Sequence, residues 1–148
     1  MRISAKGRYA LASVIHMAKE YQKDEPITLI SISEKLGISK IYLEQVFALL
    51  KRGGLVTSVK GAQGGYLLTP MPRKVTAYDV LSAVENSLFE STENTVAQQA
   101  PHIDSAMYML VFKALDAAAR EALLKTTLED LVLESEKLKG ENGFMLNI

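Results

Sequence analysis

The fold is decided by one stretch, Thr28-Leu-Ile-Ser-Ile-Ser-Glu-Lys-Leu-Gly-Ile-Ser-Lys-Ile-Tyr-Leu-Glu-Gln-Val-Phe-Ala-Leu-Leu-Lys51. Apolar residues at helical spacing predict one helix before Gly37 and a second after Ser39. Gly37 tolerates the positive φ of a sharp turn, and Ser39 can cap the second helix. Ser33, four positions before the glycine, is small enough to let the two helices pack at a steep angle. The apolar residues expected at their seam are Ile32, Leu36, Ile38, Leu43 and Val46.

The elements on either side complete a winged helix-turn-helix. A helix is predicted from Ser4 to Tyr21, ahead of the pair. After the pair, Leu55–Val59 and Tyr66–Thr69 have the composition of short strands, and a glycine-rich turn over residues 60–65 joins them as a hairpin. We therefore expect residues 1–85 to form a DNA-binding domain whose hairpin is the wing.

The chain changes character after residue 85. Residues 86–103 are polar and weakly patterned, which indicates a loop. Residues 104–139 are predicted to hold a long alanine-rich helix of about 22 residues and a last short helix from Thr127. Residues 140–148 are expected to be a flexible tail. The predicted fold class is mainly α, with a two-stranded wing and a long C-terminal dimerisation helix.

The long helix predicts a homodimer. Its alanine face permits close approach to another helix, and a lone helix of this length cannot bury an apolar face by itself. The residues expected at the dimer contact are Met107, Leu110, Ala114, Ala117 and Ala118.

The net charge of zero conceals an asymmetry along the chain. Up to Lys74 there are twelve basic and five acidic residues, a net charge of +7, and the remainder has five basic and twelve acidic residues, a net charge of −7. Such a division indicates a half that faces nucleic acid. The alternative is two solvated surfaces whose imbalance arose by chance.

Several classes of function are excluded by composition. The chain has no cysteine, which removes disulfides, thiolate nucleophiles and cysteine-ligated zinc or iron–sulfur sites. There is no catalytic Ser/His/Asp set and no phosphate-binding loop before a helix, because the glycines of residues 61–65 lie in a hairpin. His16 is expected to be a packing or surface residue and His102 a solvated loop residue. The sequence therefore predicts neither an enzyme nor a bound metal or cofactor.

The bulk pattern also predicts a cytoplasmic protein. No apolar run approaches the roughly 18 residues of a membrane span. The opening residues lack the apolar stretch of a secretory signal.

The second helix of the pair is the expected recognition helix in the major groove. Gln45 can pair with adenine, and Glu44 can accept a hydrogen bond from cytosine. Ser39 and Tyr42 suit phosphate contacts, and Lys60 is the expected contact of the wing. The full expected set from helix and wing is Ser39, Lys40, Tyr42, Glu44, Gln45, Arg52, Lys60, Gly61 and Gly64.

Three stretches resemble the Rrf2 family of bacterial transcription regulators. They are residues 1–10 (MRISAKGRYA), 37–45 (GISKIYLEQ) and 61–68 (GAQGGYLL). The resemblance implies a dimer in which the long helix crosses to the partner, and it adds Arg2 and Lys6 to the expected DNA contacts. The sequence departs from the family at Lys40-Ile41, so we expect a different operator.

A second departure concerns the iron–sulfur cluster. Cluster-binding members carry three cysteines between residues 86 and 104, where this chain has none. The chain therefore most resembles the family's repressors of cysteine metabolism, which need no cluster.

This branch implies a partner enzyme. Cysteine synthase captures partner tails that end in isoleucine, and here Phe144 is followed by a terminal Asn147-Ile148. The hypothesis is that the segment from Phe144 to Ile148 docks into cysteine synthase and that the complex controls DNA binding. The alternative is an apolar tail that is disordered or packed in the dimer.

The predicted function is sequence-specific binding of double-stranded DNA at a palindromic operator, as a repressor of cysteine or sulfur genes. The alternative is a dimeric protein-interaction module that has lost DNA binding.

Overall fold

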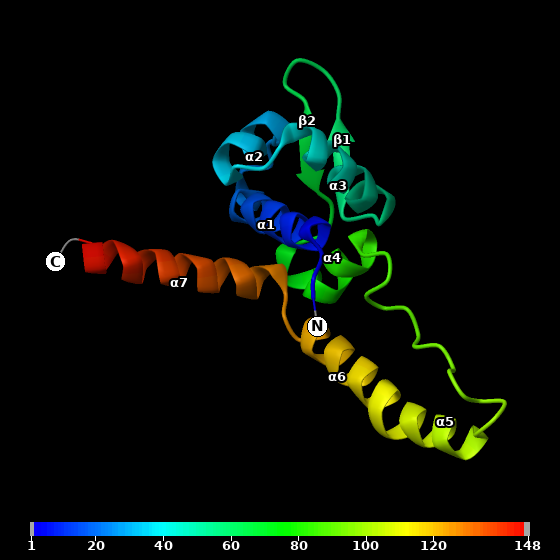
Figure 1. Ribbon diagram of the computed structural model, residues 1–148. Coiled ribbons are helices and arrows are strands. Elements are labelled where there is room, and N and C mark those ends of the chain that lie inside the picture. The colour runs from blue at the N-terminus through cyan, green and yellow to red at the C-terminus, as the bar shows by residue number, and fades with distance from the viewer. Residues whose placement is uncertain (1, 147–148) are drawn as a thin grey trace.

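The computed structural model describes the backbone of residues 2–146 and the side chains of residues 2–22 and 24–141. A winged-helix body carries two helical arms, one formed by α5 to α6 and the other by α7 (Figure 1). The elements are α1 (Ala5–Lys19), η1 (Tyr21–Lys23), α2 (Leu29–Leu36), α3 (Lys40–Arg52), β1 (Val56–Val59), β2 (Gly65–Leu68), η2 (Pro72–Lys74), α4 (Ala77–Val84), α5 (Pro101–Met107), η3 (Tyr108–Phe112), α6 (Lys113–Leu124) and α7 (Leu128–Leu146).

The helix-turn-helix is confirmed in α2 and α3. Gly37 ends α2 in the left-handed conformation at φ +69°. The Ser33 hydroxyl donates to the carbonyl oxygen of Ile38 at 2.5 Å, which ties the turn to the end of α2. Ser39 caps α3 by accepting a hydrogen bond from the backbone N–H of Tyr42 at 3.4 Å. The small residue and the glycine predicted from the sequence thus both contribute to the turn.

The wing is an antiparallel hairpin of β1 and β2, in which Val56 faces Leu68 and Val59 faces Gly65. A bridge that the sequence did not predict extends it. Ile27, just before α2, exchanges two backbone hydrogen bonds with Tyr66 at 2.9 and 2.8 Å. Gly65 permits this approach, since its φ is +150° and a Cβ there would lie 2.6 Å from the Ile27 oxygen. The base of the wing is therefore anchored to the start of the helix-turn-helix.

The core joins all parts of the winged-helix body. Its largest fully buried side chains come from α1, α2, α3, α4 and the start of α7: Phe47, Met17, Ile32, Leu43, Leu50, Leu81 and Leu128. The α7 helix also contacts α1 through Lys19, whose Nζ lies 2.7 Å from Ser135 Oγ and 3.2 Å from Glu136 Oε1. The first part of α7 thus belongs to the body and not to a separate dimerisation unit.

The predicted boundaries after residue 85 were partly wrong. The loop ends sooner than residue 103, because the long helix begins at Pro101, which suits the first turn of a helix. Asp104 is buried on this helix and accepts hydrogen bonds from the backbone N–H groups of Thr95 and Val96, both at 3.1 Å. The end of the loop is therefore attached to the helix that follows it.

The last helix is not short, and the predicted loose tail is wrong up to residue 146. A capping box of Thr127 and Asp130 starts α7, which continues for 19 residues through Gly140 to Leu146. The backbone of Phe144 lies in its last turn, and Asn147 and Ile148 lie outside the described residues. No helix in the described part of the chain has the length and apolarity needed to cross a membrane.

Candidate nucleic-acid interface

The recognition helix predicted from the sequence, α3, has one buried and one exposed face. Leu43, Val46, Phe47 and Leu50 are buried in the core. The exposed residues on the other face are Lys40, Ile41, Glu44, Gln45, Ala48, Lys51 and Arg52. At 13 residues the helix is about 20 Å long. Its exposed face therefore presents mainly polar side chains on a helix that a major groove can admit.

Lys40 and Glu44 form an ion pair in the first turns of α3. Lys40 Nζ lies 3.8 Å from Glu44 Oε1, and both side chains are about half exposed, at 51% and 55%. Surface pairs of this kind contribute about 0–1 kcal/mol to stability. The pair can therefore separate at low cost when either side chain meets DNA.

Tyr42 has a packing role that the sequence analysis missed. Its half-buried ring meets Tyr9 of α1 edge to face, with centroids 5.0 Å apart and planes at 89°. The two tyrosines hold the start of α3 against α1. No local pattern announces this contact, because the residues are 33 positions apart in the sequence.

Two side-chain contacts connect α3 to the wing. The Phe47 and Tyr66 rings lie 4.9 Å apart, and Lys51 Nζ donates to Ser58 Oγ at 3.0 Å. One contact is near the middle of α3 and the other near its end. The position of the hairpin relative to the exposed face of α3 is thus set on both sides of the packed seam.

The hairpin tip exposes Lys60 and Gly61 to solvent. The Gly64 N–H donates to the Gly61 oxygen at 3.1 Å, and a Cβ at Gly64 would collide with the Val59 oxygen. Gly61 has φ +107° and open space around it. The glycine at 64 therefore has a role in the turn itself, while Lys60 and Gly61 are accessible to a partner.

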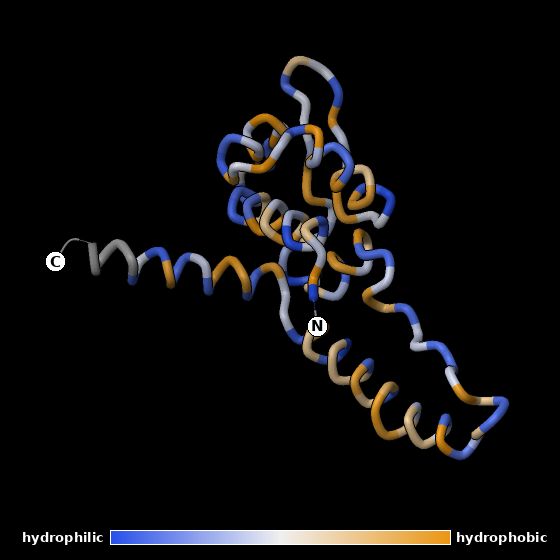
Figure 2. Tube along the Cα trace, viewed as in Figure 1, coloured by the Kyte–Doolittle hydropathy of each residue, from blue (hydrophilic) through white to orange (hydrophobic). Residues whose placement is uncertain are grey.

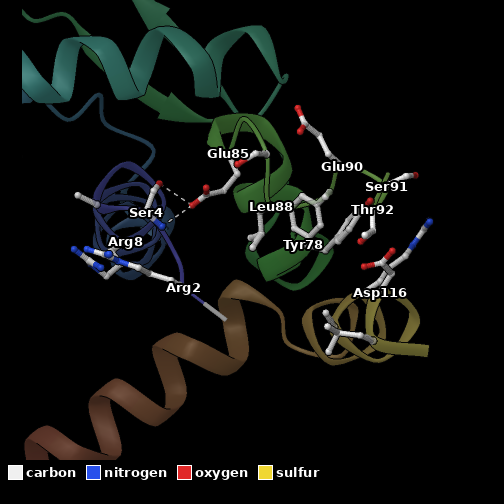
Figure 3. A pocket seen from close by; sticks show the side chains of 16 residues that line it. Arg2, Ser4, Arg8, Tyr78, Glu85, Leu88, Glu90, Ser91, Thr92 and Asp116 are labelled. Atoms are coloured by element: carbon white, nitrogen blue, oxygen red, sulfur yellow. Dashed lines mark hydrogen bonds between the residues drawn. The ribbon is translucent and has the colours of Figure 1, made fainter. Parts of the chain in front are cut away.

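The remaining expected DNA contacts lie apart from the first turns of α3. Arg52 is exposed at the other end of that helix, about 18 Å from Lys40. Lys6 is half-buried in the first turn of α1. Arg2 is exposed beside α4 and α6 at a cavity of about 930 Å³, shown in Figure 3. The structure thus brings Ser39 to Gln45 together and places Arg2 with the long helix.

This cavity lies where the start of α1, the end of α4 and α6 meet. The Glu85 carboxylate accepts hydrogen bonds from Ser4 N and Ser4 Oγ at 3.0 and 2.8 Å (Figure 3). On the α6 side, the Arg120 guanidinium lies over the Tyr78 ring, 5.2 Å from its centroid. These contacts connect the winged-helix body to the long helix.

The long helix exposes many apolar side chains, as Figure 2 shows for the arm from α5 to α6. The exposed large apolar residues on it are Ile103, Tyr108, Met109, Leu110, Val111, Leu115 and Leu124. Among the predicted dimer residues, Leu110 is 79% exposed, and Ala114, Ala117 and Ala118 are exposed. Met107 is half-buried. An apolar surface of this extent is typical of an interface between proteins.

A π turn in this helix changes the predicted arrangement of that face. η3 covers Tyr108–Phe112, and a π turn holds one residue more than an α turn. Positions beyond it are therefore shifted by about 100° relative to an unbroken α-helix. Met107 aligns with Leu115 across the turn, and no longer with Ala114 as the heptad spacing had suggested.

The described residues provide no metal centre. No group of three His, Cys, Asp or Glu side chains among them could hold an ion. His102 is exposed in the first turn of α5, and not in a loop as predicted. His16 is partly buried in α1, and burial lowers its pKa below the usual value of 6.5 despite an opposing effect of Glu20.

A helix-turn-helix with an exposed recognition helix, a hairpin wing and a long apolar helix defines a winged-helix transcription regulator. The chain belongs to the Rrf2 family. The family model, described as "Iron-dependent Transcriptional regulator", matches residues 3–134. The family and its members that resemble this chain are regulators and not enzymes, as expected.

The chain is similar to two groups of regulators within the family. The HTH-type transcriptional regulator CymR of Bacillus subtilis (strain 168) is 38% identical over 131 residues, which cover 88% of this chain and 89% of CymR. The HTH-type transcriptional regulator IscR of Pectobacterium atrosepticum is 36% identical over 138 residues, covering 93% and 83%. The solved structure of CymR, called the global cysteine regulator of B. subtilis, has a TM-score of 0.75 at 36% identity and covers 90% of this chain and 98% of that one. The predicted fold class and family are thereby confirmed.

The residues of this chain do not fit the iron that the family description names. A cysteine-held cluster lacks its thiolates, since the sequence has no cysteine. His102 lies exposed, with no grouping of potential ligands around it in the part of the chain that the structure describes.

Proposed function

We propose that this protein is a sequence-specific DNA-binding regulator that represses transcription. The observation that carries the proposal is the exposed face of α3, with Glu44 and Gln45 in its first turns, fixed beside a wing that exposes Lys60. Glu44 and Gln45 supply the acceptor and donor groups that base edges require, and Lys60 supplies a phosphate contact.

The proposal includes a homodimer on a palindromic operator. Support comes from the apolar surface of the long helix, on which Leu110 is 79% and Leu115 58% exposed. Burying such a surface against a second copy removes it from water and presents two copies of α3 with two-fold symmetry. A two-fold protein matches two half-sites related by the same symmetry.

The proposed targets are genes of cysteine or sulfur metabolism, and the proposed mechanism needs no iron–sulfur cluster. Similarity to a protein called the global cysteine regulator supports the first part. The lack of any cysteine in the sequence supports the second.

The test of DNA binding uses fluorescence anisotropy with the full chain and the DNA upstream of its own gene. We expect a specific complex whose affinity falls with rising salt, as counterion release requires. An unrelated duplex of equal length is the control. Equal affinity for both duplexes would favour the interaction module over the regulator.

We also propose cysteine synthase as a partner, bound through residues 144–148. This part of the proposal is supported by the similarity to the cysteine regulator and by the way α7 projects from the body towards that segment (Figure 1). A chain that lacks residues 144–148 should lose binding to cysteine synthase while it binds DNA unchanged. Retained binding to the enzyme would contradict the proposal.

A further inference from the structure

We propose that Ile41 reads a thymine in the operator by contact with the C5 methyl group of that base. The inference rests on the proposed DNA-binding function and names one element of its specificity. Thymine is the one base whose edge in the major groove carries an apolar group.

The exposure of Ile41 is the first observation. It is the second residue of α3, and its side chain is 71% exposed. The large apolar side chains on the other face of the same helix are buried. Ile41 is the one large apolar residue of α3 that is prominently exposed, so it takes no part in the core.

The position of Ile41 on the helix is the second observation. Single exposed apolar residues are common on protein surfaces, so exposure alone does not indicate a contact. Ile41, however, lies in the first turn of α3, one helical turn before Gln45, and residues four apart lie on the same helix face. The N-terminal turns of a recognition helix are the part that meets base edges.

Helix stability does not account for an isoleucine at this site. A β-branched side chain is a poorer helix former than alanine or lysine at an exposed position. The same branching restricts its rotamers, so less freedom is lost when it packs against a methyl group. The rise from Ile41 to Gln45 is about 6 Å, close to two base-pair steps. The thymine should therefore lie within two steps of the base that Gln45 contacts.

The first stage of the test is selection of an operator from a random duplex library with the full-length wild-type chain. Each thymine of one half-site is then replaced in turn by deoxyuridine, which removes the methyl group and keeps base pairing. We expect one position at which uracil weakens wild-type binding by about fourfold, the value for removing one buried methyl group from an apolar contact.

The second stage repeats the series with variants. Ile41→Ala should bind the thymine and uracil duplexes equally well, and Ile41→Val should retain part of the discrimination. The matched control is Ile30→Ala, which shortens an isoleucine 53% exposed on α2 and should keep the full wild-type discrimination. Circular dichroism should show unchanged folding, since both side chains are exposed.

The outcomes separate the two proposals. A library with no enriched sequence would overturn the DNA-binding function and this inference with it. An enriched operator without any uracil-sensitive position would overturn the Ile41 contact alone. The same holds for an effect of uracil that persists undiminished in Ile41→Ala.

Discussion

Two serine hydroxyls lie within the winged-helix body in contrasting environments. Ser33 is partly buried and donates to the Ile38 oxygen at 2.5 Å. Ser13 of α1 is fully buried, and its hydroxyl has no hydrogen-bond partner in the part of the chain that the structure describes. A buried hydroxyl without a partner lowers stability, whereas a satisfied one contributes to it.

We therefore expect opposite effects from the same substitution. Ser13→Ala should raise the free energy of unfolding by about 1 kcal/mol, because it removes an unsatisfied polar group. Ser33→Ala should lower it by about 1 kcal/mol, because it leaves the turn without its hydrogen bond. Urea denaturation followed by circular dichroism measures both. Destabilisation by Ser13→Ala would indicate a hydrogen bond of that hydroxyl in solution.

The residues of the DNA interface divide into those that position and those that specify. Lys60→Ala should weaken binding to all sequences alike and reduce the slope of log affinity against log salt by about one, since one phosphate contact is lost. Gln45→Ala should leave that slope unchanged and lose base preference at one operator position. Anisotropy titrations at several salt concentrations distinguish the two. Lys139→Ala, an exposed lysine on α7, is the charge-matched control and should behave as wild type.

His16 gives the folded state a dependence on pH. Burial lowers its pKa, with Lys35 and Lys19 acting in the same direction and Glu20 in the opposite one. The unfolded chain therefore binds the proton more readily than the folded chain. The stabilisation is complete above the unfolded value of 6.5 and declines as pH falls below it towards the lowered folded pKa.

Replacement by a residue that does not titrate tests this linkage. In His16→Gln, the loss of stability between pH 8 and pH 5 should be smaller than in the wild type. Urea denaturation at each pH gives the two curves. Parallel curves would show that His16 has the same pKa in both states.

At the scale of elements, local signals were enough where a few neighbouring residues determine the backbone. Gly37 with Ser33 predicted the turn of the helix-turn-helix, and Thr76 with Asp79 predicted the capping box of α4, whose two hydrogen bonds measure 2.9 and 3.1 Å. Each of these signals spans no more than five residues. The structure therefore confirms them closely.

Elements that depend on distant contacts could not be predicted in this way. The bridge between Ile27 and Tyr66 joins residues 39 positions apart, and Leu128 is buried by helices formed much earlier in the chain. The π turn at 108–112 has no composition of its own, and Gly140 suggested an end to α7 where the helix in fact continues. For the site, the pattern identified the exposed face of α3 but not the packing of Tyr42 on Tyr9.

Two glycines of the wing provide a test of this element. Gly65→Ala should destabilise the protein more than Gly61→Ala, because both positions have positive φ but only a Cβ at 65 meets the backbone of Ile27. The expected difference is about 1–3 kcal/mol, the typical range for overpacking. Thermal or urea unfolding measures it. Equal losses would mean that the bridge between Ile27 and Tyr66 adjusts without cost.

At the scale of the whole molecule, charge and apolar surface are separated. The basic residues concentrate before residue 75, in the winged-helix body, and the acidic excess follows in the arms. The arm from α5 to α6 carries the exposed apolar residues. This separation suits a dimer whose basic bodies face DNA while the arms pair with each other.

A charge placed on the long helix should break that pairing. Wild-type protein is expected at about 33 kDa by light scattering, twice the 16.3 kDa of the chain. Leu110→Glu should shift the mass towards that of one chain, because it places a carboxylate in an apolar interface. Ile30→Glu makes the same change on α2 and should leave the mass at the dimer value. A monomeric wild type would contradict the dimer.

The contacts of Phe47 with Tyr66 and of Lys51 with Ser58 have a consequence for operator geometry. They make helix and wing one rigid body, so a single subunit cannot stretch to fit a longer or shorter half-site. One base pair added between the half-sites moves one of them by about 3.4 Å and turns it by about 35° around the duplex axis. In the proposed dimer, any tolerance of such spacers must come from bending or sliding of the paired long helices.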